Sequence, residues 1–134
     1  PVEIFTAEAK ASAVSGMRNV ISGNGEREIG IHGSGANGTT IQGNSIGLTS
    51  TGGSILWEPG NLVVGIDIVG ASSTTIGGTT AAARNVIAGQ PSARIVAANA
   101  TGVLIQGNYL GTDVTGTVAL ANGGSGIVVD ASSD

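Results

Sequence analysis

The sequence repeats its own phrases at long, nearly constant intervals. RNVISGN at 18–24 returns as RNVIAGQ at 84–90, and IQGNSIG at 41–47 returns as IQGNYLG at 105–111. The two offsets are 66 and 64 residues, and GIDI returns as GIVV 61 residues later. A module of 61–66 residues that occurs almost twice predicts stacked supersecondary units.

Short β-prone segments recur within the module about every ten residues. Each places apolar residues at alternate positions, which predicts a strand with one buried face. Each ends in Gly, Asn, Ser or Ala, and Gly and Asn allow the chain to turn sharply. No segment carries a helical apolar stripe, so we expect an all-β chain. The segments are IGIHG, TTIQGNSIG, VGIDIVG, TTIGG, RNVIAG, RIVAA and VLIQGN.

Strands of this length and spacing fit an antiparallel sandwich or a parallel β-solenoid. Only the solenoid predicts that identical residues recur at whole numbers of coils, so we favour it. The 64-residue offset divides into three coils of roughly 21 residues, which predicts about 5–6 coils in the chain. Asn19 and Asn85, and likewise Asn44 and Asn108, are then expected to line up at fixed corners, where stacked amides form ladders.

The composition suits a thin core of stacked layers. The chain has 134 residues, 24 of them Gly, and Phe, Trp and Tyr occur once each. Small and β-branched residues must therefore fill the interior, which aromatics normally help to fill. We divide the chain into an N-terminal strand, cap or inter-subunit segment (1–17) and β-helix repeats (18–134). The repeats comprise a first module (18–83) and an incomplete second one (84–134).

Four phrases resemble the repeats of large bacterial right-handed parallel β-helix proteins, which are secreted or surface-exposed. They are RNVISGN (18–24), TIGGTTAAARNVIAG (75–89), IQGNYLGTDVTGTVAL (105–120) and GIVVDASS (126–133). The resemblance covers residues 18–134 and implies a right-handed coil and an extracellular location. The wider superfamily also holds pectate-lyase-like enzymes, tailspikes and adhesins, but none of the enzymes' catalytic motifs can be matched here.

Charge and composition exclude several kinds of partner. The net charge is −4 and the five basic residues are scattered, so we expect no nucleic-acid partner. No run of 18 apolar residues is present, so no membrane span is expected. Cysteine is absent, which excludes disulfides and thiolate metal sites. We expect no cofactor and no metal.

Candidate catalytic carboxylates are sparse. Asp67 and Asp130 are expected at nearly equivalent turns three coils apart, too far for a glycosidase pair. Glu26 and Glu28 are expected at a solvated corner. Asp113 in GTDVTG fits a turn former better than a calcium ligand.

Other polar candidates have plain structural interpretations. His32 is the only histidine and is expected to point outward without metal-binding partners. Arg18 and Arg84 either form a basic row for acidic sugars or bond turn carbonyls, and we favour the second. Asn37 and Asn99 begin N-x-T sequons on predicted corners.

One insertion and the two ends suggest contacts with partners. The stretch WEPGNLVVGI carries the only Trp, and Trp57 with Glu58 either contacts a glycan or partner or folds back over the coil edge. GIVVDASSD lacks the continuation TTIGG that follows GIDIVGASS, so we expect an unpaired coil there. VEIFTAEAK either caps the first coil or lies across the open end of another copy. The candidate subunit contacts are Val2, Ile4, Phe5, Ile127 and Val129.

These patterns predict a structural, non-enzymatic extracellular β-solenoid. We expect the subunit of a head-to-tail fibre, or a segment of a rod-like surface or adhesion protein. Its partners would be copies of itself, with glycans or a host or cell surface as further candidates. The alternative is a polysaccharide-binding or polysaccharide-degrading β-helix, with Trp57, Asp67 and Asp130 as its residues. A weaker third hypothesis is an ice- or surface-binding face built from Thr39, Thr40, Thr74 and Thr75.

Overall fold

The computed structural model describes residues 18–56 and 64–130. Apart from one short 3-10 helix, η1 (Ser34–Ala36), every regular element in these ranges is a strand, as expected for an all-β chain. Three parallel sheets contain all the strands. Sheet A holds β1 (Asn19–Ile21), β4 (Asn44–Ile46), β7 (Val86–Ile87) and β10 (Tyr109–Leu110). Sheet B holds β2 (Arg27–His32), β5 (Val64–Val69), β8 (Ile95–Ala98) and β11 (Ile127–Asp130), and sheet C holds β3 (Thr40–Ile41), β6 (Thr75–Gly77) and β9 (Leu104–Gln106).

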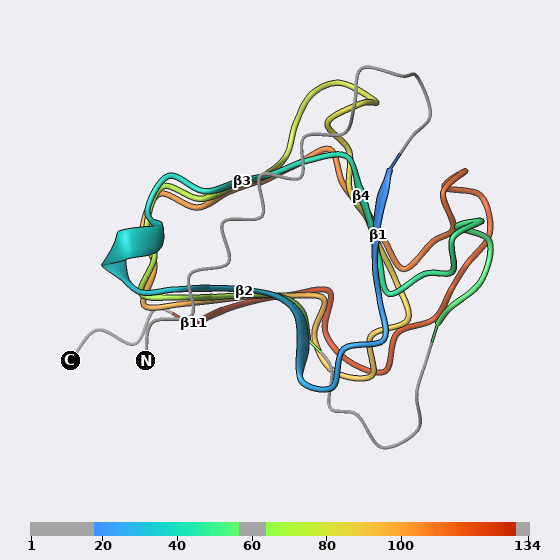
Figure 1. Cartoon of the computed structure of the whole chain (residues 1–134), viewed down its shortest axis with the longest axis horizontal. Helices are drawn as coiled ribbons and strands as arrows, with labels where there is room; N and C mark the ends of the chain where they lie inside the picture. The colour runs from blue at the N-terminus through green and yellow to red at the C-terminus, as the bar shows by residue number, and fades with distance from the viewer. Residues whose placement is uncertain (1–17, 57–63, 131–134) are drawn as a thin grey trace.

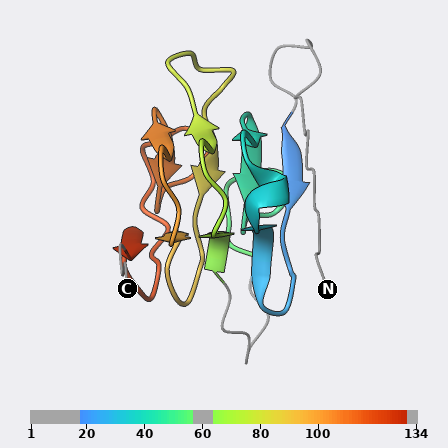
Figure 2. The ribbon, with the colours of Figure 1, turned by 90° about the vertical axis from the view of Figure 1, so that its left-hand side faces the viewer.

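The chain runs through the three sheets in a fixed order, A then B then C, and then begins again (Figure 1). Each such round is called a pass. Each inner strand pairs in parallel with the strand of the preceding pass and with that of the following pass, and each edge strand pairs with one such neighbour in the described ranges. Figure 2 shows the passes side by side, from β1 and β2 at one end to β11 at the other. The parallel pairing excludes the antiparallel sandwich, because the described strands form no antiparallel ladder.

Like residues stack on like residues inside the three sheets. In sheet B, Ile29, Ile66, Ile95 and Ile127 occupy one row, and each lies in register with the next. Sheet C continues the pattern with a row of Ile41, Ile76 and Ile105. The β-branched side chains suit a pleated surface, and their burial supplies most of the core. The core therefore runs along the stack as a thin apolar strip, as the scarcity of aromatic residues predicts.

The expected coil length of 21 residues is wrong. Along the asparagine column of sheet A, successive passes are 25, 41 and 23 residues apart. One short pass and one long pass together make the repeated module, so the module spans two coils and not three. Sheets A and B each hold four strands in the described ranges, whereas five to six coils were expected for the whole chain.

The long pass contains an antiparallel hairpin, and its connection from β6 to β7 (78–85) is also longer than the connections from β3 to β4 and from β9 to β10. Leu48 pairs with Ile55 in this hairpin, and Thr112 pairs with Ala119 in the equivalent one of the second module. The intervening pass through β7 has no such bridge. The sequence therefore repeats at the length of the module. It does not repeat at the length of one coil, because short and long passes alternate.

The asparagines form a ladder at the corner before sheet A, and it is a single column, whereas the sequence aligned Asn19 only with Asn85 and Asn44 only with Asn108. Asn19 Nδ2 donates to Asn44 Oδ1 at 3.0 Å. Asn44 donates its backbone N–H and its Nδ2 to Asn85 Oδ1, both at 3.0 Å. Asn85 donates in the same way to Asn108 Oδ1, at 3.1 and 3.0 Å. All four residues thus belong to one column, and each bond runs toward the next pass.

Candidate functional site

The end of the stack at β11 exposes residues of the core rows. Ile66 and Ile95 are 0 % exposed, whereas Ile127 in the same row is 43 % exposed. In the neighbouring row Ala97 is buried, whereas Val129 beside it is 70 % exposed. The side chains at β11 therefore follow the pattern of the core, and no further strand of the described residues covers them.

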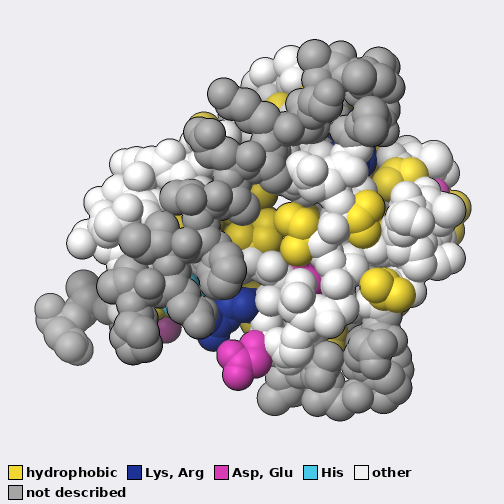
Figure 3. Space-filling view, viewed as in Figure 1, with side chains coloured by type: hydrophobic (Ala, Val, Ile, Leu, Met, Phe, Trp, Pro, Cys, Tyr) yellow, Lys and Arg dark blue, Asp and Glu magenta, His cyan; other side chains and the backbone are white. Residues whose placement is uncertain are grey.

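The opposite end of the stack carries β1 and β2. Figure 3 views the molecule from that side, and hydrophobic side chains gather in the middle of the face. Val20 of β1 is among the exposed large apolar residues, whereas Ile29 and Ile31 of β2 are buried. The two ends of the stack thus differ in how much of their apolar rows they expose.

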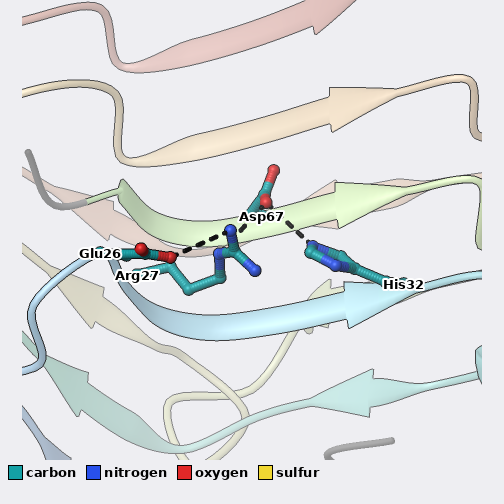
Figure 4. A network of polar contacts seen from close by, with 4 residues as sticks. All are labelled: Glu26, Arg27, His32 and Asp67. Atoms are coloured by element: carbon teal, nitrogen blue, oxygen red, sulfur yellow. Dashed lines mark hydrogen bonds and ion pairs between the residues drawn. The ribbon is translucent and has the colours of Figure 1, made fainter. Parts of the chain in front are cut away.

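A polar cluster lies on the outer face of sheet B (Figure 4). His32 Nε2 donates to Asp67 Oδ2 at 2.9 Å, and Arg27 Nε lies 3.5 Å from the same oxygen. Glu26 pairs with Arg27 at 3.6 Å, and its own side chain is largely exposed. His32 points outward as predicted, but it has a partner that sequence reasoning did not find.

Gly30 makes this cluster possible. It is the residue of β2 in register with Asp67, and a Cβ there would lie 2.8 Å from Arg27 Cδ. The bare backbone lets the Arg27 side chain cross the strand to reach the carboxylate of the next pass. The Asp67 carboxylate is therefore held by a guanidinium and an imidazole, an arrangement that links neighbouring passes.

Asp67 and Asp130 do not occupy equivalent positions, contrary to the sequence-based expectation. Asp67 lies in register with Gly30 and Val96, whereas Asp130 lies in register with Ala98. Both residues are in strands and not at turns, and two passes separate them in place of three. Two passes along the stack and an offset of two residues along the strands put their backbone positions about 12 Å apart, which exceeds the separation of about 5–9.5 Å in a glycosidase pair.

The arginines before the repeated NVI phrase bond turn carbonyls, as predicted. Arg18 Nη1 donates to the carbonyl of Arg84, and Arg84 Nε donates to the carbonyl of Gly107 at 3.0 Å. The Arg84 guanidinium also stacks on the Tyr109 ring, 4.2 Å from its centroid. Burial and, secondarily, the charge of Arg84 lower the pKa of Arg18.

Asp113 is a turn former, as predicted. Its carboxylate accepts hydrogen bonds from the Thr115 hydroxyl at 2.7 Å and from the backbone N–H of Thr117 and Val118. These bonds, the Thr115 hydroxyl first, lower the pKa of Asp113. These hydrogen bonds hold the turn of the second hairpin together.

An open groove of about 470 Å³ lies beside the segment that follows β7, between the two hairpins. Small and apolar residues form most of its wall, which offers few groups to orient a ligand. Its lining consists of Ile55, Gly89, Gln90, Pro91, Ala121 and Gly123.

Several predicted site residues lie outside the described ranges. These are the candidate glycan or partner contacts Trp57 and Glu58 and the candidate subunit contacts Val2, Ile4 and Phe5. In the part of the chain that the structure describes, no group of three or more His, Cys, Asp or Glu residues is placed to hold a metal ion. The same part contains no helix long and apolar enough to cross a membrane.

Comparison with known proteins adds no relative. No protein-family model matches the chain. No curated protein and no solved structure matches it either.

Proposed function

We propose that the chain is a right-handed parallel β-helix with a structural, non-catalytic role as a unit of a rod. The repeated passage through sheets A, B and C supports a continuous coil. Crossovers between parallel strands are right-handed in nearly all proteins, and the resemblance of the repeated phrases points the same way. A coil of this kind is rigid along its axis because every pass is bonded to the next.

The rod extends by stacking the β11 end on a coil of another copy. The observation that carries this proposal is the exposure of Ile127 and Val129 in rows that are otherwise buried. An uncovered strand edge with apolar residues is a template for further pairing. Burying these two side chains would contribute about 2 kcal/mol before backbone pairing is counted.

The resemblance to secreted and surface β-helix proteins supports an extracellular or cell-surface location. A rod built from such units would serve as a fibre or as the stalk of an adhesion protein. Its partners are then copies of the same chain, and the surface to which the rod attaches.

Sedimentation velocity over a range of concentrations tests the stacking. The unmodified chain should associate, and Val129→Glu should weaken association at least about 30-fold, because the charge would be buried at the joint. Val118→Glu is the matched control, since Val118 is 51 % exposed but lies on the second hairpin. Circular dichroism would verify that both variants fold. Equal association of the two variants would refute stacking at β11.

A further inference from the structure

Two arginines occupy one column at the edge of sheet A. The registers of this sheet, continued back from its strands, place four residues side by side in successive passes, namely Arg18, Gly43, Arg84 and Gly107. Two passes and not three therefore separate the arginines, and the residue between them has no side chain. The Arg18 side chain extends along the stack across Gly43, because its Nη1 donates to the Arg84 carbonyl.

The two guanidinium groups lie about one pass apart. The Arg18 guanidinium is bonded to the carbonyl of Arg84, and the Arg84 guanidinium is bonded through Nε to the carbonyl of Gly107, the next residue of the column. Neighbouring passes of a parallel sheet are about 4.8 Å apart, so the two charged groups are close enough to contact one small ion. Burial and, after it, the charge of Arg84 lower the pKa of Arg18, which agrees with this proximity.

Neither of these arginines has a carboxylate partner. No ion pair among the described residues involves Arg18 or Arg84. Arg27, by contrast, lies 3.6 Å from Glu26 Oε2 and 3.5 Å from Asp67 Oδ2. Two neighbouring positive charges thus lack a counter-charge in a chain whose net charge is −4.

Both guanidinium groups are held in place and keep unused donors. Each has five N–H donors, and each donates one hydrogen bond to a backbone carbonyl within the described ranges. The Arg84 guanidinium is also stacked on the Tyr109 ring, which fixes its plane. Both arginines are partly exposed, so an ion from the solvent can reach them.

We propose that Arg18 and Arg84 together bind a phosphate group. A guanidinium recognises phosphate oxygens with paired N–H donors in one plane. A phosphate monoester carries a charge of about −1.5 to −2 at pH 7 and compensates both cations, whereas a carboxylate compensates only one. Free phosphate and a phosphorylated molecule share this chemistry. The site goes beyond the proposed function and does not depend on stacking through β11.

Equilibrium dialysis against radiolabelled inorganic phosphate tests the site, whether or not copies of the chain associate. The unmodified chain should bind one phosphate. Arg18→Gln and Arg84→Gln should each raise the Kd at least tenfold. Arg27→Gln is the matched control, because it removes the same charge from an arginine that already has carboxylate partners, and it should change the Kd less than twofold.

Competition identifies the source of the phosphate group. Glucose 6-phosphate should displace the label, and acetate at equal ionic strength should need at least a tenfold higher concentration. Displacement by glucose 6-phosphate at lower concentrations than by unlabelled phosphate would indicate a phosphorylated molecule as the ligand, and equal displacement would indicate free phosphate. Circular dichroism would verify folding. Arg84→Lys replaces Arg84→Gln if the latter does not fold, and it should also weaken binding, because lysine keeps the charge but not the planar group.

Three results would overturn the proposal. If Arg27→Gln weakens binding as much as Arg84→Gln, phosphate responds to the general charge of the chain and the two-arginine site is wrong. If acetate displaces the label as well as phosphate does, the pair does not select a doubly charged group. If the folded, unmodified chain retains no phosphate at millimolar concentration, no such site exists, and this result would leave the stacking through β11 unaffected.

Discussion

Substitution of Asn85 by Ala removes the centre of the asparagine ladder. Asn85 is fully buried, and its Oδ1 accepts both the N–H and the Nδ2 of Asn44. Its Nδ2 donates to the carbonyl of Ile41 at 2.8 Å and to Asn108 Oδ1. The variant leaves at least two buried backbone groups, one donor and one acceptor, without their partner.

The expected cost of Asn85→Ala is about 3 kcal/mol. Each buried polar group left unsatisfied costs about 1–3 kcal/mol. A domain of this size has a total free energy of unfolding of about 5–15 kcal/mol, so the loss is a large fraction of it. Asn19→Ala is the matched control, because this exposed residue donates a single bond to Asn44 and should cost less than about 1 kcal/mol.

Urea unfolding followed by far-ultraviolet circular dichroism measures both variants. The midpoint should fall clearly for Asn85→Ala and slightly for Asn19→Ala, with unchanged slopes. Equal losses in the two variants would refute the view that the ladder is held by its buried interior bonds.

Three further predictions concern the turns and two titrating groups. Gly107→Ala should lower the free energy of unfolding in urea by at least about 2 kcal/mol, because Gly107 has φ +64° and a Cβ would lie 2.0 Å from the Gly78 carbonyl oxygen. Gly25→Ala is the control and should have little effect, because the space around Gly25 is open. Equal losses of stability in the two variants would contradict this geometry. The pKa of Asp113 is lowered from its usual 3.8, so its contribution to stability is present above that pH and is lost as pH falls through the folded value; Asp113→Asn should therefore flatten the acid side of a stability–pH curve, and an unaltered curve would contradict this. The pKa of Glu28 is raised from its usual 4.5, so its contribution is complete below that pH and is lost as pH rises through the folded value; Glu28→Gln should remove this loss, and an identical pH dependence in the two chains would contradict it.

The strands and the ladder could be predicted because they are local or repeated. Alternation of apolar residues located the strand in VGIDIVG, which became β5, and that in RIVAA, which became β8. Recurrence of the amide predicted that Asn19 aligns with Asn85 and Asn44 with Asn108, because parallel passes place equivalent residues in one column. That the two pairs share one column could not be predicted, because it depends on the number of passes in a module, which the loop lengths set.

The coil length and the polar cluster could not be predicted in the same way. Coil length depends on how many residues leave the coil in hairpins such as that closed by Leu48 and Ile55, and both modules contain the same alternation. The contact of His32 with Asp67 joins residues 35 positions apart, an interval set by those loops and by no repeated motif. Gly30 was the one signal of the cluster in the sequence, because its lack of a side chain leaves room for Arg27. This signal can be interpreted only when the register of β2 with β5 is known.

Electron microscopy of the unmodified chain at micromolar concentration tests end-to-end stacking most directly. Head-to-tail assembly predicts filaments with a strong spacing of about 4.8 Å and an axial repeat of about 19 Å, which is four passes of that spacing. Dispersed particles of single-chain mass at all concentrations would contradict the stacking of copies through β11.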